Sequence, residues 1–151
     1  MVDRFERFSL AIFEISHCWH KLAAEEMAKY GLKGPHAIYL HTLYRSEQSL
    51  TAAQLCELCG RDKADVSRAM ALMEEKGLVK KEGGSVNQYR ARLVLTDKGV
   101  QAAEHVCSRA SVAVEHAGSG ISDADRAVFY SALESIAANL QTLSKEGLPQ
   151  K

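Results

Sequence analysis

The sequence has only two prolines among its 151 residues, four cysteines and few aromatic residues, and its formal net charge is zero. The neutral balance excludes a uniformly basic coat, although a local basic patch remains compatible with it. No apolar run reaches the ~18 residues of a membrane-spanning helix, and charges interrupt the apolar start, unlike in a signal peptide. So few, irregularly spaced cysteines do not make a secreted disulfide framework. We therefore expect a cytoplasmic globular protein that does not enter a membrane.

The centre of the chain has the pattern of a winged helix. Thr51 and Asp62 are suited to cap two short helices, the first ending at Gly60 and the second at Gly77, which makes a helix-turn-helix. After Gly77 the pattern becomes that of two strands joined by a hairpin loop. The sequence thus predicts a mainly α fold (α+β), with a winged helix-turn-helix and a small β-hairpin over about residues 35–98.

Long amphipathic helices flank this centre. Apolar residues recur at three- and four-residue steps over residues 4–29, and further helices are expected over about 97–116 and 122–144. Their apolar stripes cannot all be buried on so small a core, which favours a dimer with interlocked terminal helices. We expect one domain over the whole chain, with dimerisation helices at about 1–31 and 99–145.

The charge is distributed unevenly along the chain. Nine Lys or Arg and six Asp or Glu lie from Arg61 to Lys98, so this segment carries +3 and the remainder −3, the direction that DNA binding requires. Arg68 suits guanine or phosphate, and Asp65 suits a cytosine amino group or the orientation of Arg68. The alternative is a solvated helix face. The candidate DNA-binding residues in the first turns of the second helix are Lys63, Asp65, Ser67 and Arg68.

Two stretches, "LTAAQLCELCGRDKADVSRAMALMEEKGLV" and "LVLTDKG", carry a resemblance to a known family. Their order of a short helix, a glycine, a lysine-containing cap, Val-Ser-Arg, a Glu-Lys-Gly-Leu-Val exit and Leu-Thr-x-x-Gly resembles the MarR family of bacterial transcription factors. The resemblance implies a homodimeric winged-helix repressor or activator. Its recognition helix would enter the major groove of a palindromic operator and its wing the minor groove. A small molecule or an oxidant would control its release.

The wing departs from the family pattern. Members commonly carry an arginine just before the second strand, where this sequence has Asn87, Gln88 and Tyr89. Arg90 comes one residue late, which reverses the direction of its side chain unless the loop bulges. Asn87 and Gln88 can still donate hydrogen bonds in a minor groove. The candidate DNA-binding residues of the wing are Asn87, Gln88, Arg90 and Arg92.

Other side chains are candidates for sensing an oxidant, a small molecule or a metal ion. Cys56 and Cys59 form a C-x-x-C pair, for which core packing is favoured over a redox or zinc site. The resemblance makes Cys18, in the first helix, a candidate oxidant sensor. The candidate effector-pocket residues are Trp19, Tyr39 and Tyr44. A metal site assembled from scattered histidines (36, 41, 105, 116) with Cys107 or Glu104 is the weaker alternative, so no metal and no cofactor are predicted.

A phosphate loop, a Ser/His/Asp grouping and paired carboxylates are all missing from the sequence, so we expect no enzyme. The favoured function is a sequence-specific DNA-binding regulator, most simply a repressor, that binds double-stranded DNA as a homodimer and responds to an unknown small molecule or oxidant. The alternative is a winged-helix protein–protein adaptor without specific DNA readout.

Overall fold

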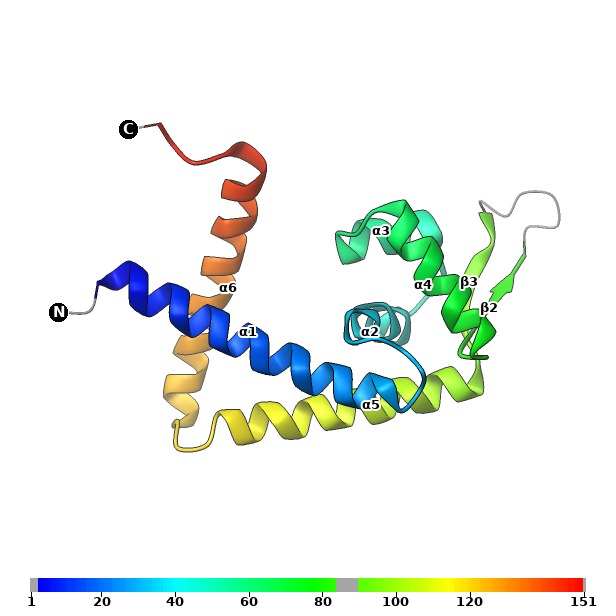
Figure 1. Ribbon diagram of the computed structural model, residues 1–151, viewed down its shortest axis with the longest axis horizontal. Helices are drawn as coiled ribbons and strands as arrows, with labels where there is room; N and C mark the ends of the chain where they lie inside the picture. Colours follow the sequence, from blue (N-terminus) through cyan, green and yellow to red (C-terminus); the bar gives the residue numbers. More distant parts are fainter. Residues whose placement is uncertain (1–2, 84–89, 151) are drawn as a thin grey trace. The chain divides into compact units, whose positions relative to one another are not determined.

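The computed structural model describes residues 3–83 and 90–150 and has the mainly helical fold that the sequence predicts. It divides into two compact units, Met1–Ser111 and Val112–Lys151, which are described separately. None of the described helices is long and apolar enough to cross a membrane. In chain order (Figure 1) the elements are α1 (Arg4–Ala28), η1 (Gly34–His36), α2 (Ala37–Arg45), β1 (Leu50–Thr51), α3 (Ala52–Cys59), α4 (Lys63–Glu75), β2 (Val79–Glu82), β3 (Arg92–Leu95), α5 (Asp97–Ala117) and α6 (Asp123–Glu146).

Helices α3 and α4 form the predicted helix-turn-helix. Thr51 Oγ1 accepts the backbone N–H of Gln54 at 3.3 Å, and Gln54 Oε1 accepts the backbone N–H of Thr51 at 2.9 Å. Gly60 then ends α3 at a φ of 60°, a left-handed conformation that glycine adopts without strain. Asp62 Oδ1 accepts the backbone N–H of Asp65 at 2.8 Å and begins α4. The caps predicted at Thr51 and Asp62 are therefore confirmed.

The sheet beside this motif has one strand more than the sequence predicted. β2 and β3 form the expected antiparallel hairpin, and the two-residue strand β1 pairs with the other edge of β3, which gives the order β1-β3-β2. In register, Leu50 lies opposite Leu93 and Thr51 opposite Arg92. Because β1 leads directly into α3, this pairing fixes the start of the helix-turn-helix against the wing.

The core of the first unit lies between α2, α3, α4 and the sheet. The predicted helix over 35–45 begins as the 3₁₀ turn η1, with Pro35 in its first turn, and continues as α2. The largest fully buried side chains come from α2, α3 and α4, from the turn after α4 and from the end of α1. They are Met27, Tyr39, Leu40, Leu55, Val66, Met73 and Leu78.

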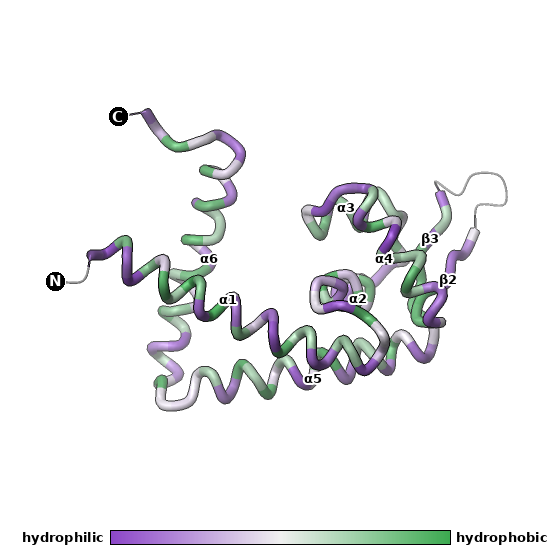
Figure 2. Tube along the Cα trace, in the orientation of Figure 1, coloured by the Kyte–Doolittle hydropathy of each residue, from purple (hydrophilic) through white to green (hydrophobic). Residues whose placement is uncertain are grey.

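The terminal helices keep much of their apolar surface exposed. On α1 the exposed side chains include Phe5, Phe13 and Ile15, and apolar and polar residues alternate along the helix in Figure 2. In the second unit, α6 likewise exposes Val128 and Phe129. A chain that leaves so many large apolar side chains in water on two helices has surface suited to a further contact.

Within the second unit, the turn between α5 and α6 is closed by polar contacts. Arg126 donates to Glu115 Oε2 at 3.1 Å and to the carbonyl of Gly118 at 2.9 Å. Ser122 Oγ accepts the backbone N–H of Asp125 at 3.2 Å. Ser122 thus caps α6, one turn before Arg126.

Candidate nucleic-acid interface

Helix α4 has one buried face and one exposed face. Its buried residues recur at steps of three and four, as expected of a helix lying on a core. They are Val66, Ala69, Met70 and Met73. Asp62 caps the N-terminus of α4, and a helix N-terminus attracts anions.

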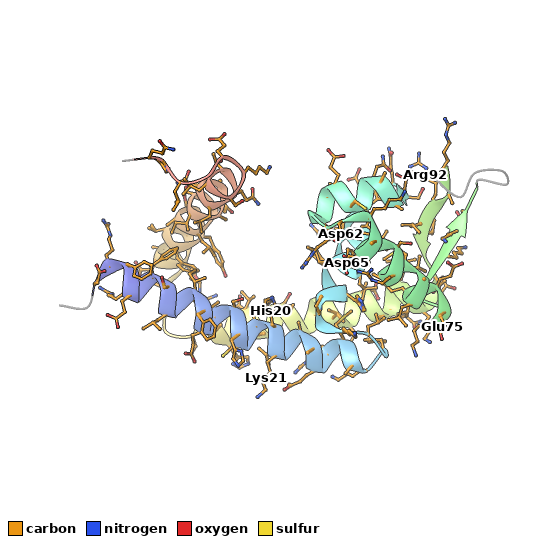
Figure 3. The ribbon with its side chains drawn as sticks, turned by 45° about the horizontal axis from the view of Figure 1, so that its top comes forward. His20, Lys21, Asp62, Asp65, Glu75 and Arg92 are labelled. Carbon is orange, nitrogen blue, oxygen red and sulfur yellow. The ribbon has the colours of Figure 1, made fainter. Side chains whose placement is uncertain are left out.

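The first turns of α4 carry the four predicted residues, of which Lys63, Ser67 and Arg68 are exposed and Asp65 is half-buried. Arg68 has 74% of its side chain exposed, and its Nη2 lies 3.9 Å from Asp65 Oδ1. Lys63 and Ser67 line a hollow of about 380 Å³. The structure thus brings Lys63, Asp65, Ser67 and Arg68 together on the start of one helix; in Figure 3 the labelled Asp62 and Asp65 mark this region.

The hollow lies between α3, α4 and the two long strands. Its lining combines apolar side chains with one lysine from α4 and one from β2. Its lining residues are Ala52, Ala53, Cys56, Lys63, Ser67, Met70, Lys81, Ala91 and Leu93. A hollow with two lysines beside a helix N-terminus suits the negatively charged backbone of a nucleic acid.

Asp65 is also held from the core side, by Tyr39 of α2. The Tyr39 hydroxyl donates to Asp65 Oδ2. Burial, and then the Asp65 carboxylate, raise the pKa of Tyr39, so its hydroxyl remains protonated and acts as the donor. The neighbouring His36 has its pKa lowered by burial, against the opposing influence of Asp65. The N-terminal end of α4 is therefore tied to α2 as well as capped.

The two described arginines of the wing, Arg90 and Arg92, differ in their contacts. Arg90 is exposed just before β3, while Arg92 is exposed within it and donates through Nη1 to the carbonyl of Ser49 at 2.6 Å. Arg92 thus bonds to the segment before β1 as well as facing solvent. The predicted wing residues Asn87 and Gln88 lie outside the described residues.

The three candidate effector residues have different neighbours. Trp19 is 42% exposed on α1. The Tyr44 hydroxyl lies 3.4 Å from Glu104 of α5, whereas the Tyr39 hydroxyl is committed to Asp65. Whether a bound molecule gathers these side chains around it stays a prediction.

The cysteines are all free thiols in different settings. Cys18 is exposed on α1, while Cys59 is buried with its Sγ 3.4 Å from Thr42 Oγ1. Cys107 lies 3.4 Å from His41 Nδ1, and burial raises the pKa of its thiol, which lowers its reactivity. Among residues 3–83 and 90–150, no three His, Cys, Asp or Glu side chains gather as a metal site would require.

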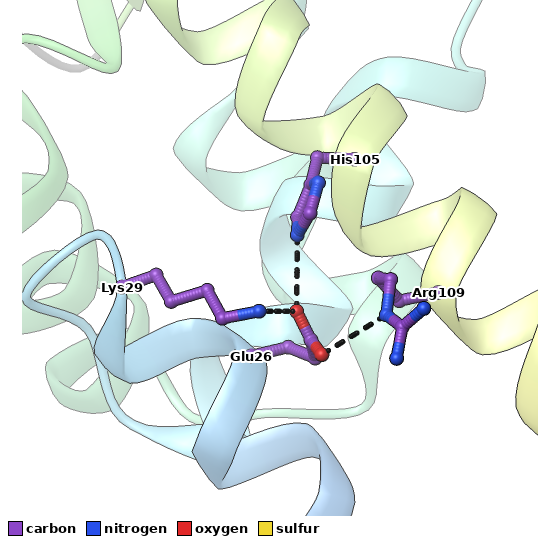
Figure 4. A network of polar contacts seen from close by, with 4 residues as sticks. All are labelled: Glu26, Lys29, His105 and Arg109. Atoms are coloured by element: carbon purple, nitrogen blue, oxygen red, sulfur yellow. Dashed lines mark hydrogen bonds and ion pairs between the residues drawn. The ribbon is translucent and has the colours of Figure 1, made fainter.

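One polar cluster, in which Glu26 of α1 contacts α5 (Figure 4), was not predicted from the sequence. Glu26 Oε2 accepts from Lys29 at 2.7 Å and lies 3.0 Å from His105 Nε2, and Oε1 accepts from Arg109 at 3.2 Å. The hydrogen bond from Lys29 is the main cause that lowers the Glu26 pKa to about 2, although burial opposes it. Charges separated by some 80 positions have no periodicity that could reveal such pairs beforehand.

The comparisons with known proteins agree with this geometry. Residues 30–87 match the model of the MarR family. A MarR transcriptional regulator from Methanosarcina mazei Go1 is 23% identical, with a TM-score of 0.78 over 93% of each chain. A putative MarR regulator from Listeria monocytogenes, complexed with 26mer DNA, is 21% identical, with a TM-score of 0.76 over 100% of this chain and 99% of that one.

A third solved structure is the MepR–DNA complex of S. aureus, which is 20% identical, with a TM-score of 0.77 over 87% of this chain and 97% of that one. No curated protein matches the chain. The resemblance to the MarR family and the winged-helix fold are thereby confirmed.

Proposed function

On the premise of this resemblance to the MarR family, we propose that the protein is a sequence-specific DNA-binding transcriptional regulator that acts as a homodimer. The observation that carries the proposal is the start of α4, a capped helix N-terminus that presents Lys63, Ser67 and Arg68 opposite its buried face. Two of the similar solved structures are complexes with DNA. In a helix-turn-helix these first turns are the part that reaches base edges in the major groove.

The division of work between the residues follows from their chemistry. The guanidinium of Arg68 offers paired donors to guanine, and Lys63 and Ser67 suit phosphate or base atoms. Arg90, with Asn87 and Gln88, is assigned to the adjacent minor groove, and Arg92 supports the base of the wing through Ser49. Binding by two copies requires a palindromic operator with half-sites about one helical turn apart.

We further propose that the protein is a repressor and that a small molecule or an oxidant releases it from DNA. Trp19 and Tyr44 are its candidate contacts for a small molecule, and the exposed Cys18 is its candidate thiol for an oxidant. The competing function, a protein–protein adaptor, draws support from the zero net charge and from the wing's departure from the family pattern.

Selection of binding sites from random duplex DNA by the purified protein tests the proposal. We expect enrichment of one palindrome, bound by a dimer, with an affinity that falls as salt rises. Weak binding without an enriched sequence would contradict specific readout and would favour the adaptor.

A second experiment tests whether an oxidant releases the protein from DNA through Cys18. DNA binding by the wild type and by Cys18→Ser is measured in the presence of peroxide. If peroxide still releases Cys18→Ser from DNA, Cys18 is excluded as the oxidant sensor.

A further inference from the structure

Tyr39 links the core of the winged helix to the helix that is proposed to read DNA. Its side chain is only 1% exposed, yet its hydroxyl reaches the carboxylate of Asp65, 26 residues further along the chain, in the first turn of α4. A buried hydroxyl without a partner is costly, so this bond is strongly favoured over an unpaired hydroxyl. One polar atom of the core thus sits directly behind the exposed face of α4.

Asp65 divides its contacts between the core and the surface. Its Oδ2 accepts from Tyr39, its Oδ1 faces Arg68 at 3.9 Å, and its backbone N–H donates to Asp62. The carboxylate is therefore fixed on the core side while its charge acts on the guanidinium three residues further along. Without the tie to Tyr39, the same charge would be free to turn toward an approaching phosphate, which it repels.

Arg68 is the side chain whose direction this arrangement restricts. It is a long and largely exposed side chain, and ordering such a side chain at an interface costs free energy. A fixed carboxylate at its base restricts the directions it takes before DNA arrives. The arrangement is a three-member chain from a core hydroxyl, through a carboxylate, to a base-reading guanidinium.

We infer that Tyr39 is a positioning residue for DNA recognition: through Asp65 it sets the direction of Arg68 and so sharpens the preference for one base. This inference rests on the proposed function. It assigns a role in specificity to a residue that never touches DNA, and it separates Tyr39 from its neighbour Tyr44, whose hydroxyl faces α5.

The first test uses the protein without DNA. Tyr39→Phe keeps the ring in the core and removes only the hydroxyl, and Tyr44→Phe is the matched control on the same helix. Tyr39→Phe is expected to speed backbone amide exchange in the first turn of α4 about fivefold or more, while Tyr44→Phe leaves it unchanged. Equal exchange in both variants would overturn the link between Tyr39 and α4.

The second test measures readout on the selected palindrome and on its single-base variants. The base read by Arg68 is the one at which Arg68→Ala loses discrimination. Tyr39→Phe should lower discrimination at that base about tenfold and leave the other positions intact. Asp65→Asn should give a similar loss, and the double variant should lose little more than either single one. A Tyr39→Phe protein that is less stable but keeps its base preference would overturn the inference.

The two tests also separate this inference from the function on which it rests. A wild-type protein that selects no sequence refutes the proposed function and, with it, a role for Tyr39 in readout, even where exchange confirms the link to α4. A wild-type protein that selects a palindrome, with a Tyr39→Phe variant of identical preference, refutes the positioning role alone.

Discussion

Thr96 and Gly99 show how a short motif can be explained by contacts of single residues. Thr96 Oγ1 donates to the carbonyl of Gly77 at 2.6 Å and accepts the backbone N–H of Gly99 at 3.0 Å. The Thr96 backbone N–H donates to the Leu78 carbonyl at 3.0 Å. The stretch "LVLTDKG" is thus the joint at which the sheet, the exit of α4 and the start of α5 meet, and no part of it needs to touch DNA.

Replacement of Gly99 by alanine should be strongly destabilising. A Cβ at this position would lie 2.0 Å from the carbonyl oxygen of Leu78, which is backbone and cannot turn aside. We expect Gly99→Ala to lower the free energy of unfolding by about 3 kcal/mol, measured by urea denaturation. Gly60→Ala is the control, because a Cβ there meets nothing within 4 Å and costs only its left-handed backbone, about 1 kcal/mol. Equal losses in the two variants would contradict the steric explanation.

Residue by residue, local chemistry was predictable and distant pairing was not. The caps at Thr51 and Asp62 could be identified because capping depends on residue type and on partners within one turn. The bond between Tyr39 and Asp65 depends on how α2 crosses α4, which periodicity does not encode. The sequence therefore indicates Tyr39 only as a candidate pocket residue, and the structure gives its hydroxyl a partner.

At the scale of elements, α2 lies between two others and contacts both through polar side chains. Tyr39 reaches α4, whereas His41 and Tyr44 meet Cys107 and Glu104 of α5. A second polar joint, the Glu26 cluster, connects α1 with the same helix α5 (Figure 4). These polar contacts hold the winged helix against α5, and α5 against α1.

The Glu26 cluster should make stability depend on pH. The pKa of Glu26 falls from an ordinary 4.5 to about 2 in the folded chain, so its contribution is complete above pH 4.5 and is lost as pH falls toward 2. Glu26→Gln should therefore lower the urea midpoint most at pH 6–7 and progressively less toward pH 3. Glu25→Gln, an exposed neighbour, is the control; a Glu26→Gln deficit independent of pH would contradict the ionic role of the cluster.

The elements themselves were largely readable from the sequence, and strand β1 was the exception. Long stripes at helical spacing predicted α1, α5 and α6, and the glycine and cap residues predicted the limits of α3 and α4. Strand β1 has only two residues and exists because β3 offers it a free edge. A strand so short has no alternation to detect.

At the scale of the whole molecule, the exposed apolar residues of α1 and α6 are the main observation that a single chain leaves unexplained. Phe13 is 71% exposed, and so is Val128. The sequence predicted this surplus, since the stripes are too many for the central core, and from it the proposed homodimer. How two copies fit together depends on surfaces of both, which one sequence does not specify.

If α1 lies in a dimer interface, a charge on its apolar face should weaken association. We expect Phe13→Glu to shift the protein toward the mass of one chain in sedimentation, because burying a carboxylate without a partner is unfavourable. Leu58→Glu is the matched control, since Leu58 is 63% exposed on α3 of the winged helix. An unchanged dimer for Phe13→Glu, or dissociation by both variants alike, would exclude this face of α1.

The most direct test of the central claim, that the start of α4 reads DNA, is the affinity of Arg68→Ala for the selected palindrome at moderate salt. Lys21→Ala, which removes a positive charge from exposed α1 (Figure 3), is the control. We expect Arg68→Ala to weaken binding by roughly 1–3 kcal/mol and to reduce the preference at one base pair of each half-site, while Lys21→Ala leaves both unchanged. Wild-type affinity and preference in Arg68→Ala would contradict a role of α4 in reading DNA.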